Sequence, residues 1–400
     1  MSVEVITILQ IIFTVASIVY QQEQAKKMRE AAKDRAATRN VRVSGSNNPI
    51  PIVYGYCRIT NAINVFTNTS STFELPTVSN ETELGDLTAF NGDRNETLIT
   101  QHVLSSAELS KVVWADIDDV TFDDTKYKDY YKSYVNKSGG STLSSSTLGR
   151  LSTATFNNVA YSTEFFKMNR NEPQYQGKPS VAYYVQGKKI RTITNGVLST
   201  SRVFSNNTVL VLLDYLLDAE FGPGMSLSDI DLNSFETAIL VANQVVRANA
   251  EVGGKIYEKQ EITTRNILRH EFNGMIYPDK DHAANIAEIL NPVVGCILFR
   301  SSTGKLKLSV PNPEVSTISQ VVGTINDTYL IDDIHYSQSD TNARANQVKV
   351  AYANSKKDFA ADSYEETNTV YKSQDNDVPL IADINYNGVT NVYQAEGIAK

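Results

Sequence analysis

The chain has 400 residues, 41% of them hydrophobic, which is enough to bury a core and excludes wholesale disorder. Its 37 basic and 45 acidic side chains leave a net charge of -8, which argues against a protein that binds nucleic acid by neutralising phosphates. Two distant cysteines, Cys57 and Cys296, exclude a disulfide scaffold and a cysteine-rich zinc module. A length of this size predicts roughly two to four domains.

The N-terminal segment is predicted to form one long helix. Val3–Tyr20 is almost continuously apolar, and no glycine or proline occurs before Gly45. The residues that follow, as far as about Thr38, are rich in good helix formers. The chain opens Met-Ser-Val-Glu, which lacks the basic start of a cleaved signal peptide.

Two interpretations of this helix stay open. In the first it spans a membrane, because the apolar run has about the length required. A basic flank would then lie at the lipid headgroups, and it includes Lys26, Lys27 and Arg29.

In the second interpretation the helix belongs to a bundle. Apolar residues follow one another at alternating spacings of three and four, and β-branched residues along such a seam favour a trimer over a dimer. The predicted trimer seam consists of Val5, Ile8, Ile12, Val15 and Val19. The other faces of the helix are apolar too, so protein or lipid must cover them.

After Val41 the pattern is that of a β-rich α+β protein. Strands are predicted where runs of β-branched and aromatic residues lie between polar loops, and one of them is entered through two prolines. The predicted strands cover residues 49–59, 97–104, 111–122, 265–277 and, as a pair, 330–353. Apolar periodicity predicts helices over residues 209–217, 232–248 and 281–290, and another helix from residue 391.

Two β-hairpins are predicted from turns that contain glycine. One covers Ser180–Ile193 with Gly187 in its turn, and the other joins residues 293–299 to 305–310. The polar tracts 67–72 and 77–82 are predicted to be loops, and the Ser/Gly/Thr tract 138–147 a loop insertion.

These elements divide the chain into consecutive regions. We expect an N-terminal helix at residues 1–40, β-rich domains with a loop insertion at 41–205, an α+β domain at 206–320 and a β domain at 321–400. The last helix starts close to the end of the sequence, so we expect this final domain to be incomplete.

No known catalytic motif occurs in the sequence. Phosphate-binding glycine motifs, HExxH and a nucleophile elbow are all missing, so we expect no enzymatic activity, no cofactor and no metal. A group of aspartates between Asp116 and Asp124 offers oxygen ligands for Ca²⁺, but the spacing is not that of an EF-hand loop, and a solvated strand end or turn is the simpler interpretation. The four histidines are isolated in sequence and are expected at the surface or in a satisfied core: His102, His270, His282 and His335.

Several segments between Asn48 and Tyr352 carry a resemblance through their order and spacing. The first is the strand entered through two prolines, which ends Tyr-Gly-Tyr-Cys-Arg-Ile at residue 59. The others are residues 102–120, 179–190, 207–230, 272–308 and 342–352. Together they resemble the central tail-hub, or tip-attachment, proteins of long-tailed, lambda-like bacteriophages, although residues 102–120 lack the glycine of that family's turn. The N-terminal helix lies outside the resemblance.

The resemblance implies a structural role at the distal end of a virion tail. Members of this family form trimers that close the tail tube, organise the baseplate and open for DNA passage. It therefore implies a homotrimer of tube-like β domains with an α+β insertion. The partners it implies are distal-tail, tape-measure and other tail-tip proteins. DNA would pass without tight binding, which a net charge of -8 suits.

Two other functions are compatible with parts of the sequence. The apolar N-terminal run and the Asn/Thr-rich β body would suit a membrane-anchored surface adhesin. Contact of the N-terminal helix with the host membrane is an expectation for the tail hub. A tail-associated cell-wall hydrolase would need paired acids in a cleft or a Cys/His pair, whereas the carboxylates here are scattered through predicted loops.

Overall fold

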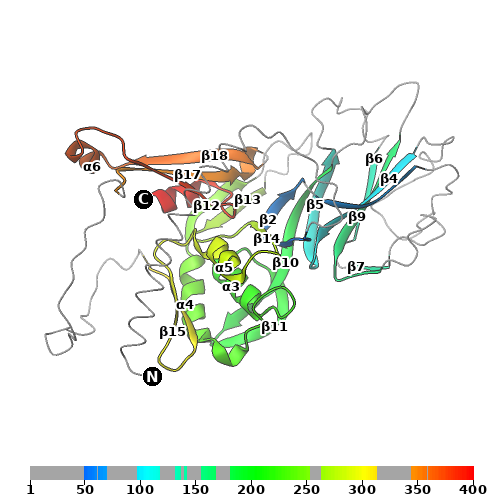
Figure 1. Ribbon diagram of the computed structural model, residues 1–400, viewed down its shortest axis with the longest axis horizontal. Coiled ribbons are helices and arrows are strands. Elements are labelled where there is room, and N and C mark those ends of the chain that lie inside the picture. Colours follow the sequence, from blue (N-terminus) through cyan, green and yellow to red (C-terminus); the bar gives the residue numbers. More distant parts are fainter. Residues whose placement is uncertain are drawn as a thin grey trace.

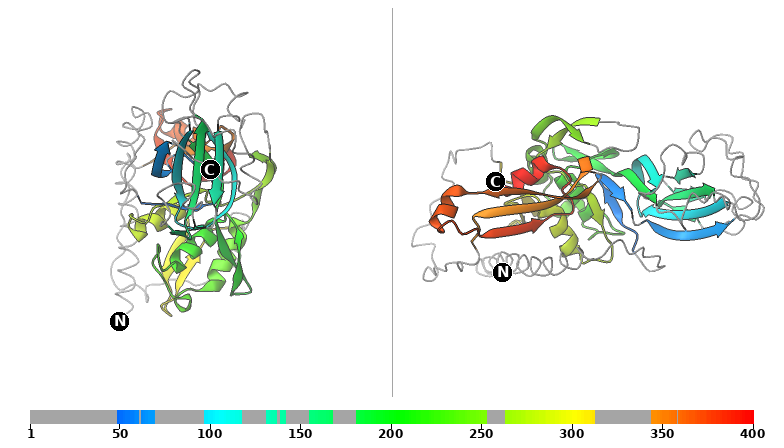
Figure 2. Two further views of the ribbon diagram at one scale, coloured as in Figure 1. Left: turned by 90° about the vertical axis from the view of Figure 1, so that its right-hand side faces the viewer. Right: turned by 90° about the horizontal axis from the view of Figure 1, so that it is seen from above.

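The structure is a computed structural model, and its β-rich α+β fold confirms the predicted class. It describes residues 49–60, 62–69, 97–117, 131–136, 139–141, 155–167, 181–252, 263–312, 344–357 and 359–400. The described elements form an elongated molecule (Figure 1). Helices α3, α4 and α5 lie in the middle, the sheet containing β4 and β9 at one end, and α6 with β17 and β18 at the other; the view from above in Figure 2 shows the same order.

The long strand β10 (Val181–Thr194) organises the middle of the molecule. It pairs in antiparallel fashion with β2 (Tyr56–Ile59), β5 (Leu109–Ile117) and β11 (Val197–Phe204). The first three residues of β10 are all buried, and from Tyr183 onward buried and partly exposed residues largely alternate. One strand thus joins the N-terminal elements to the helical region.

The predicted hairpin with its turn at Gly187 is wrong, because β10 passes through this residue without turning. The backbone N–H of Gly187 donates to the carbonyl of Gly55 at 2.7 Å, and a Cβ at this position would overlap the carbonyl of Val53. The turn lies instead at Asn195–Gly196, where both residues have positive φ, at 51° and 69°. Asn-Gly is the preferred pair for a two-residue hairpin turn, whereas Gly187 serves the close approach of two backbones.

The strand predicted at residues 49–59 is present but divided. β1 (Ile52–Tyr54) and β2 are separated by Gly55, whose φ of 68° belongs to the left-handed region. β1 pairs with β14 (Gly274–Ile276), while β2 pairs with β10. The glycine therefore directs one run of apolar residues into two sheets.

Three helices pack around a single core. They are α3 (Thr208–Leu217), α4 (Leu232–Ala242) and α5 (His282–Leu290). α3 is buried along almost its whole length, and its core also takes in Ile52 from β1 and Ile190 from β10. The side chain of Asn207 caps α3 by accepting from the N–H groups of residues 209 and 210.

The predicted helix 232–248 is too long by its last six residues. α4 ends at Ala242, and β12 (Val245–Val252) begins at once and pairs with β13 (Thr263–Leu268). The β-branched pair Val245-Val246 favours the strand, where its χ1 restriction carries no cost. The hairpin predicted at 293–310 is confirmed as β15 (Ile297–Arg300) and β16 (Leu306–Ser309).

A separate sheet lies at one end of the molecule, in the order β3-β4-β9-β6. β4 (Thr97–Ser105) and β9 (Ala160–Lys167) form its centre, β3 (Ile63–Thr69) and β6 (Tyr131–Asn136) its sides. The predicted strand 97–104 is confirmed. The expected loop at 67–72 is wrong in its first residues, which continue β3. The expected loop insertion at 138–147 begins with a short strand, β7 (Gly139–Ser141), which pairs with β8 (Thr155–Asn157).

The C-terminal unit is a three-stranded sheet with one covering helix. β17 (Gln347–Asn354) lies between β18 (Ala360–Thr367) and β19 (Ile381–Asn385), antiparallel to the first and parallel to the second. The short helix α6 (Thr369–Gln374) lies in the connection between those outer strands. The helix predicted from residue 391 is confirmed as α7 (Val392–Ala399), and it packs on Val350 and Tyr352 of β17.

The predicted N-terminal helix lies outside the described residues, as does the first of the two strands predicted in 330–353. Within the ranges that the structure describes, no helix is both long and apolar enough to cross a membrane.

Candidate functional site

A buried charge cluster joins β1, β10 and α3, and we refer to these residues as the lysine cluster: Tyr54, Lys188, Asp214 and Asp218. The ammonium group of Lys188 lies 2.7 Å from Oδ2 of Asp214 and 2.8 Å from Oδ2 of Asp218. The three charged side chains are 10%, 5% and 14% exposed. Lysine is rarely buried to this degree without paired carboxylates.

The two carboxylates of the lysine cluster have different surroundings. Asp214 accepts a second hydrogen bond from the Tyr54 hydroxyl, at 2.8 Å. Asp218 uses its other oxygen to accept from two backbone N–H groups, those of Glu220 and Phe221, both at 3.0 Å. Burial alone would raise the pKa of Asp218, but Lys188 and these N–H groups outweigh it and lower that pKa. Burial, followed by the charge of Asp214, raises the pKa of Tyr54, so this phenol keeps its proton.

A second buried pair joins β13 to the segment before β14. Arg265 contacts both oxygens of Glu271, at 2.5 and 2.8 Å, and Glu271 has no exposed surface. The backbone N–H of Leu268 donates to the same carboxylate at 2.9 Å. The Arg265 guanidinium also lies 4.9 Å from the ring centre of Tyr56. Bidentate pairing and ring stacking fix this arginine in one position.

The C-terminal unit is attached to the middle of the molecule through polar contacts. Asn273 accepts from the backbone N–H of Tyr56 at 2.9 Å and donates to the hydroxyl of Thr390 at 2.9 Å. Gln394 of α7 donates to the carbonyl of Glu271 at 2.7 Å. Phe272 packs against Gly388, where a Cβ would collide with its ring. These contacts connect the C-terminal unit to the middle of the molecule.

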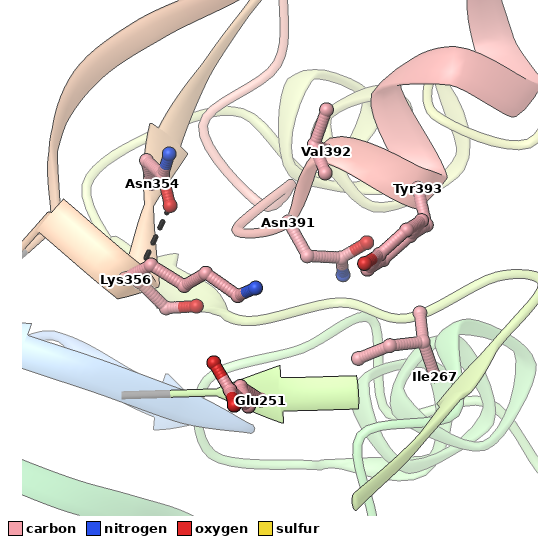
Figure 3. Close-up of a pocket in the computed structure, with 8 residues that line it drawn as sticks. Glu251, Ile267, Asn354, Lys356, Asn391, Val392 and Tyr393 are labelled. Atoms are coloured by element: carbon pink, nitrogen blue, oxygen red, sulfur yellow. Dashed lines mark hydrogen bonds between the residues drawn. The ribbon is translucent and has the colours of Figure 1, made fainter. Parts of the chain in front are cut away.

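A small cavity of about 30 Å³ lies at the same junction (Figure 3). Glu251 and Ile267 line it from one side, and Lys356, Asn391 and Tyr393 from the other. The amide nitrogen of Asn391 is buried and has no hydrogen-bond partner among the described residues. The cavity has room for one water molecule, which would satisfy such a donor.

Another buried polar group connects the end sheet to β10. The Tyr183 hydroxyl donates to Glu164 at 2.7 Å, accepts from Ser162 at 2.7 Å and lies 3.1 Å from Nδ1 of His102. Because the single hydroxyl proton goes to Glu164, Nδ1 of His102 must act as the donor in its contact. Burial is the main cause that raises the pKa of Tyr183, and the charge of Glu164 is the second.

Two of the histidines in the described ranges fit the expectation of satisfied or surface residues. His270 does not, because its buried Nδ1 has no hydrogen-bond partner among the described residues. His102 belongs to the group just described, and Nδ1 of His282 lies 2.8 Å from the hydroxyl of Tyr215. Burial, together with the charge of Arg269, lowers the pKa of His270 to about 4. His335 lies outside the described residues.

No group of His, Cys, Asp or Glu side chains suited to a metal occurs in the part of the chain that the structure describes. Of the predicted acidic cluster, Asp116 belongs to β5, and the other aspartates lie outside the described residues. For this acidic cluster, the solvated strand end or turn and the Ca²⁺ site therefore both stay predictions from the sequence.

The residues predicted for the trimer seam and the membrane flank are also outside the described residues. They are Val5, Ile8, Ile12, Val15 and Val19 for the seam, and Lys26, Lys27 and Arg29 for the flank.

An exposed apolar tip is present at the far end of the C-terminal unit. It comprises Val370, Tyr371, Val378 and Ile381. The loop that carries it is tightly held, because Asp375 accepts from Arg344 at 2.7 Å and from Asn346 at 3.0 Å. Several neighbouring apolar side chains on a fixed surface loop are typical of a contact surface.

Sequence reasoning missed the lysine cluster altogether. The predicted elements place Lys188 in a hairpin next to its expected turn, Asp214 inside the helix 209–217 and Asp218 just after that helix. The one local signal was the spacing of four residues between the two aspartates, which in a continuous helix puts two side chains on the same face. In the structure α3 ends at Leu217 and Asp218 is its C-cap.

Comparison with known proteins identifies a similar fold. No family model matches the chain, and no curated protein matches it. Among solved structures, a chain of the virion of a native gene transfer agent (GTA) particle is similar, with a TM-score of 0.50 and 11% sequence identity. The similarity covers 90% of this chain and 74% of that chain. The protein therefore shares its fold with a component of a virion, and at this identity the likeness concerns the fold alone.

Proposed function

We propose that this protein is a structural component of a phage-like virion. The observation that carries the proposal is the fold similarity to a chain of the GTA virion over 90% of this chain. A similarity of this extent involves the arrangement of several units and not one common motif. The elongated series of sheets also suits a subunit that contacts several neighbours.

More specifically, we propose a tail-tip hub that closes the distal end of the tail tube and opens for DNA delivery. The ordered segments between Asn48 and Tyr352, which resemble the tail-hub family, support this position. We propose a homotrimer that contacts distal-tail, tape-measure and other tail-tip proteins. The exposed apolar tip supplies one surface for such contacts.

Electron microscopy of the particle and of the purified full chain tests this proposal. We expect rings with three-fold symmetry, and we expect antibody against the chain to label the distal end of the tail. Label on the capsid would exclude the hub. A chain that is monomeric both in the particle and when purified at micromolar concentration would exclude it too.

We propose that the N-terminal helices of three copies meet on the three-fold axis. Burial of a Val or Ile side chain contributes about 1.5–3 kcal/mol, so the seam of Val5, Ile8, Ile12, Val15 and Val19 favours association. The outer apolar faces would pack on the tube wall or the tape-measure protein. After release they could enter the host membrane, with Lys26, Lys27 and Arg29 at the headgroups.

We also propose that the protein is not an enzyme. The support is the lack of catalytic motifs in the sequence. A peptidoglycan-release assay with purified protein should give no more product than the buffer control. Release that disappears when one carboxylate is replaced would establish a cell-wall hydrolase instead.

A further inference from the structure

The lysine cluster has the composition and geometry of a site that forms an amide between side chains. We propose that Lys188 and Asp214 become joined by an intramolecular isopeptide bond, with Asp218 and Tyr54 transferring the protons. The inference rests on the buried contacts around Lys188 and is independent of the function proposed above.

The reacting groups are held together by separate elements of the fold. Lys188 belongs to β10 and Asp214 to α3, and the amine nitrogen lies 2.7 Å from a carboxylate oxygen of its partner. Both side chains are at most 10% exposed. A nucleophile and an electrophile kept at such a distance react as if at very high concentration, and effective molarities reach roughly 10⁵–10⁸ M in well-oriented systems.

Asp218 is placed to act as the base. Its Oδ2 lies 2.8 Å from the nitrogen of Lys188, while Oδ1 accepts two backbone N–H groups of the following loop. These backbone contacts hold the carboxylate ionised and aim its free oxygen at the amine. An ammonium group must lose a proton before it can attack a carbonyl carbon, and this neighbour can accept it.

Tyr54 is placed to act on the leaving oxygen. Its hydroxyl donates to Oδ2 of Asp214 at 2.8 Å, the same oxygen that lies next to Lys188. An oxygen that accepts from two donors withdraws electrons from its carbon, which makes that carbon more open to attack. Tyr54 itself has no exposed surface, and its ring lies 5.9 Å from the nitrogen of Lys188.

The reaction balances without an added reagent. The nitrogen of Lys188 attacks Cγ of Asp214, the new C–N bond forms, and the bond from Cγ to Oδ2 breaks. Two protons leave the ammonium group, and both end on the departing oxygen. The products are one amide and one water molecule, and Asp218 and Tyr54 return to their starting protonation states.

The surroundings favour the product. Burial of an ammonium and a carboxylate is unfavourable, and only part of this cost is offset by their attraction. The amide replaces both charges with one neutral group. Asp218 loses Lys188 as its counter-ion, but its side chain is 14% exposed and keeps the two backbone hydrogen bonds that stabilise its charge.

Mass spectrometry of the purified full chain tests the proposal. We expect an intact mass that is lower than the sequence mass by one water molecule. Because an aspartate can also lose water by forming a succinimide, protease digestion must follow. The deciding result is a branched peptide in which Lys188 is linked to Asp214.

Variants separate the roles in the cluster. Lys188→Arg should restore the full mass, and Asp218→Asn should slow formation of the link by about 100-fold or more, the usual contribution of a general base to a rate. Lys189→Arg is the matched control, because the side chain of Lys189 is 42% exposed and pairs with Glu108. In this variant Lys188 and Asp214 should stay linked. Circular dichroism establishes whether each variant is folded.

The wild-type chain alone can overturn the proposal, whatever the variants do. If folded wild-type protein keeps its full mass after days at neutral pH, and Lys188 and Asp214 appear only in separate peptides, the lysine cluster is a non-covalent ion triad.

Discussion

At the scale of single residues, the described structure depends on buried charges that are fully paired. Glu271 has no exposed surface, and Arg265 satisfies both of its oxygens. Such a pair adds little over an apolar contact, yet removal of one partner leaves a buried charge without compensation. The pair therefore makes the two flanking strands sensitive to one substitution.

Arg265→Ala should accordingly lower the free energy of unfolding by about 3–5 kcal/mol, as is found when one partner of a buried pair is removed. Loss of the contact with the Tyr56 ring adds to this effect. Urea unfolding followed by circular dichroism measures it. Lys307→Ala is the control, because Lys307 and its partner Asp231 are 38% and 23% exposed, and it should change stability by at most about 1 kcal/mol. Equal effects of the two substitutions would contradict the argument.

His270 gives the protein a pH dependence at the same scale. Burial, with the charge of Arg269, lowers its pKa from 6.5 to about 4. The unfolded chain therefore binds the proton more readily, so the contribution of neutral His270 is complete above about pH 6.5 and is lost as the pH falls toward 4.

We expect the wild type to lose about 2–3 kcal/mol between pH 7 and pH 4 through His270 alone, a figure reduced for the partial exposure of the ring. His270→Gln removes the titrating group. The measurement is the difference in unfolding free energy between variant and wild type at several pH values. A difference that stays constant across this range would show that His270 does not titrate as described.

At the scale of elements, the contact between β1 and β10 is built on a backbone approach that only glycine allows. Gly187→Ala would place a methyl group against the carbonyl of Val53, and neither backbone can move without disturbing its sheet. We expect a loss of at least about 2 kcal/mol in unfolding free energy, or a chain that does not fold.

Gly397→Ala is the matched control for this prediction. It lies within α7, and a Cβ there meets nothing within 4 Å. Alanine favours a helix over glycine by about 0.5–1 kcal/mol, so this variant should be as stable as the wild type or more stable. If both substitutions lower the free energy of unfolding equally, the close approach of the two backbones at Gly187 does not explain the loss of stability.

At the scale of the whole molecule, a C-terminal unit with its own small core is tied to the middle by side-chain hydrogen bonds. The proposed hub places three such chains in a ring around the N-terminal helices. In this arrangement the helix seam adds to association through the β-rich body. A substitution in the seam should therefore weaken association without unfolding the body.

Ile12→Asp tests that separation. A carboxylate in a trimer seam repels its copies and removes an apolar contact, so we expect weaker association and reduced infectivity of particles, while the body keeps its wild-type unfolding transition. Ser2→Asp, which lies outside the seam, is the control. Particles with Ile12→Asp that assemble and infect normally would contradict the axial helix bundle.

The sequence by itself determined the class of fold and the position of most of its elements. Apolar periodicity located α3 and α5, and alternation located β17, because these signals depend on one face of the element turned toward the core. β4 was located as a run of β-branched and apolar residues, and its side chains from Leu98 to Ser105 are all buried. The Asn-Gly pair before β11 was a local signal too, and it was overlooked in favour of Gly187.

Only the tertiary structure decided what Gly187, Lys188 and the end of α4 do. Gly187 is required by a distant backbone, and the charge of Lys188 is tolerated because α3 brings two aspartates to it. Val245 and Val246 join a strand because β13 is there to pair with them. Each of these outcomes depends on a partner far away in the sequence, and a local pattern carries no information about such a partner.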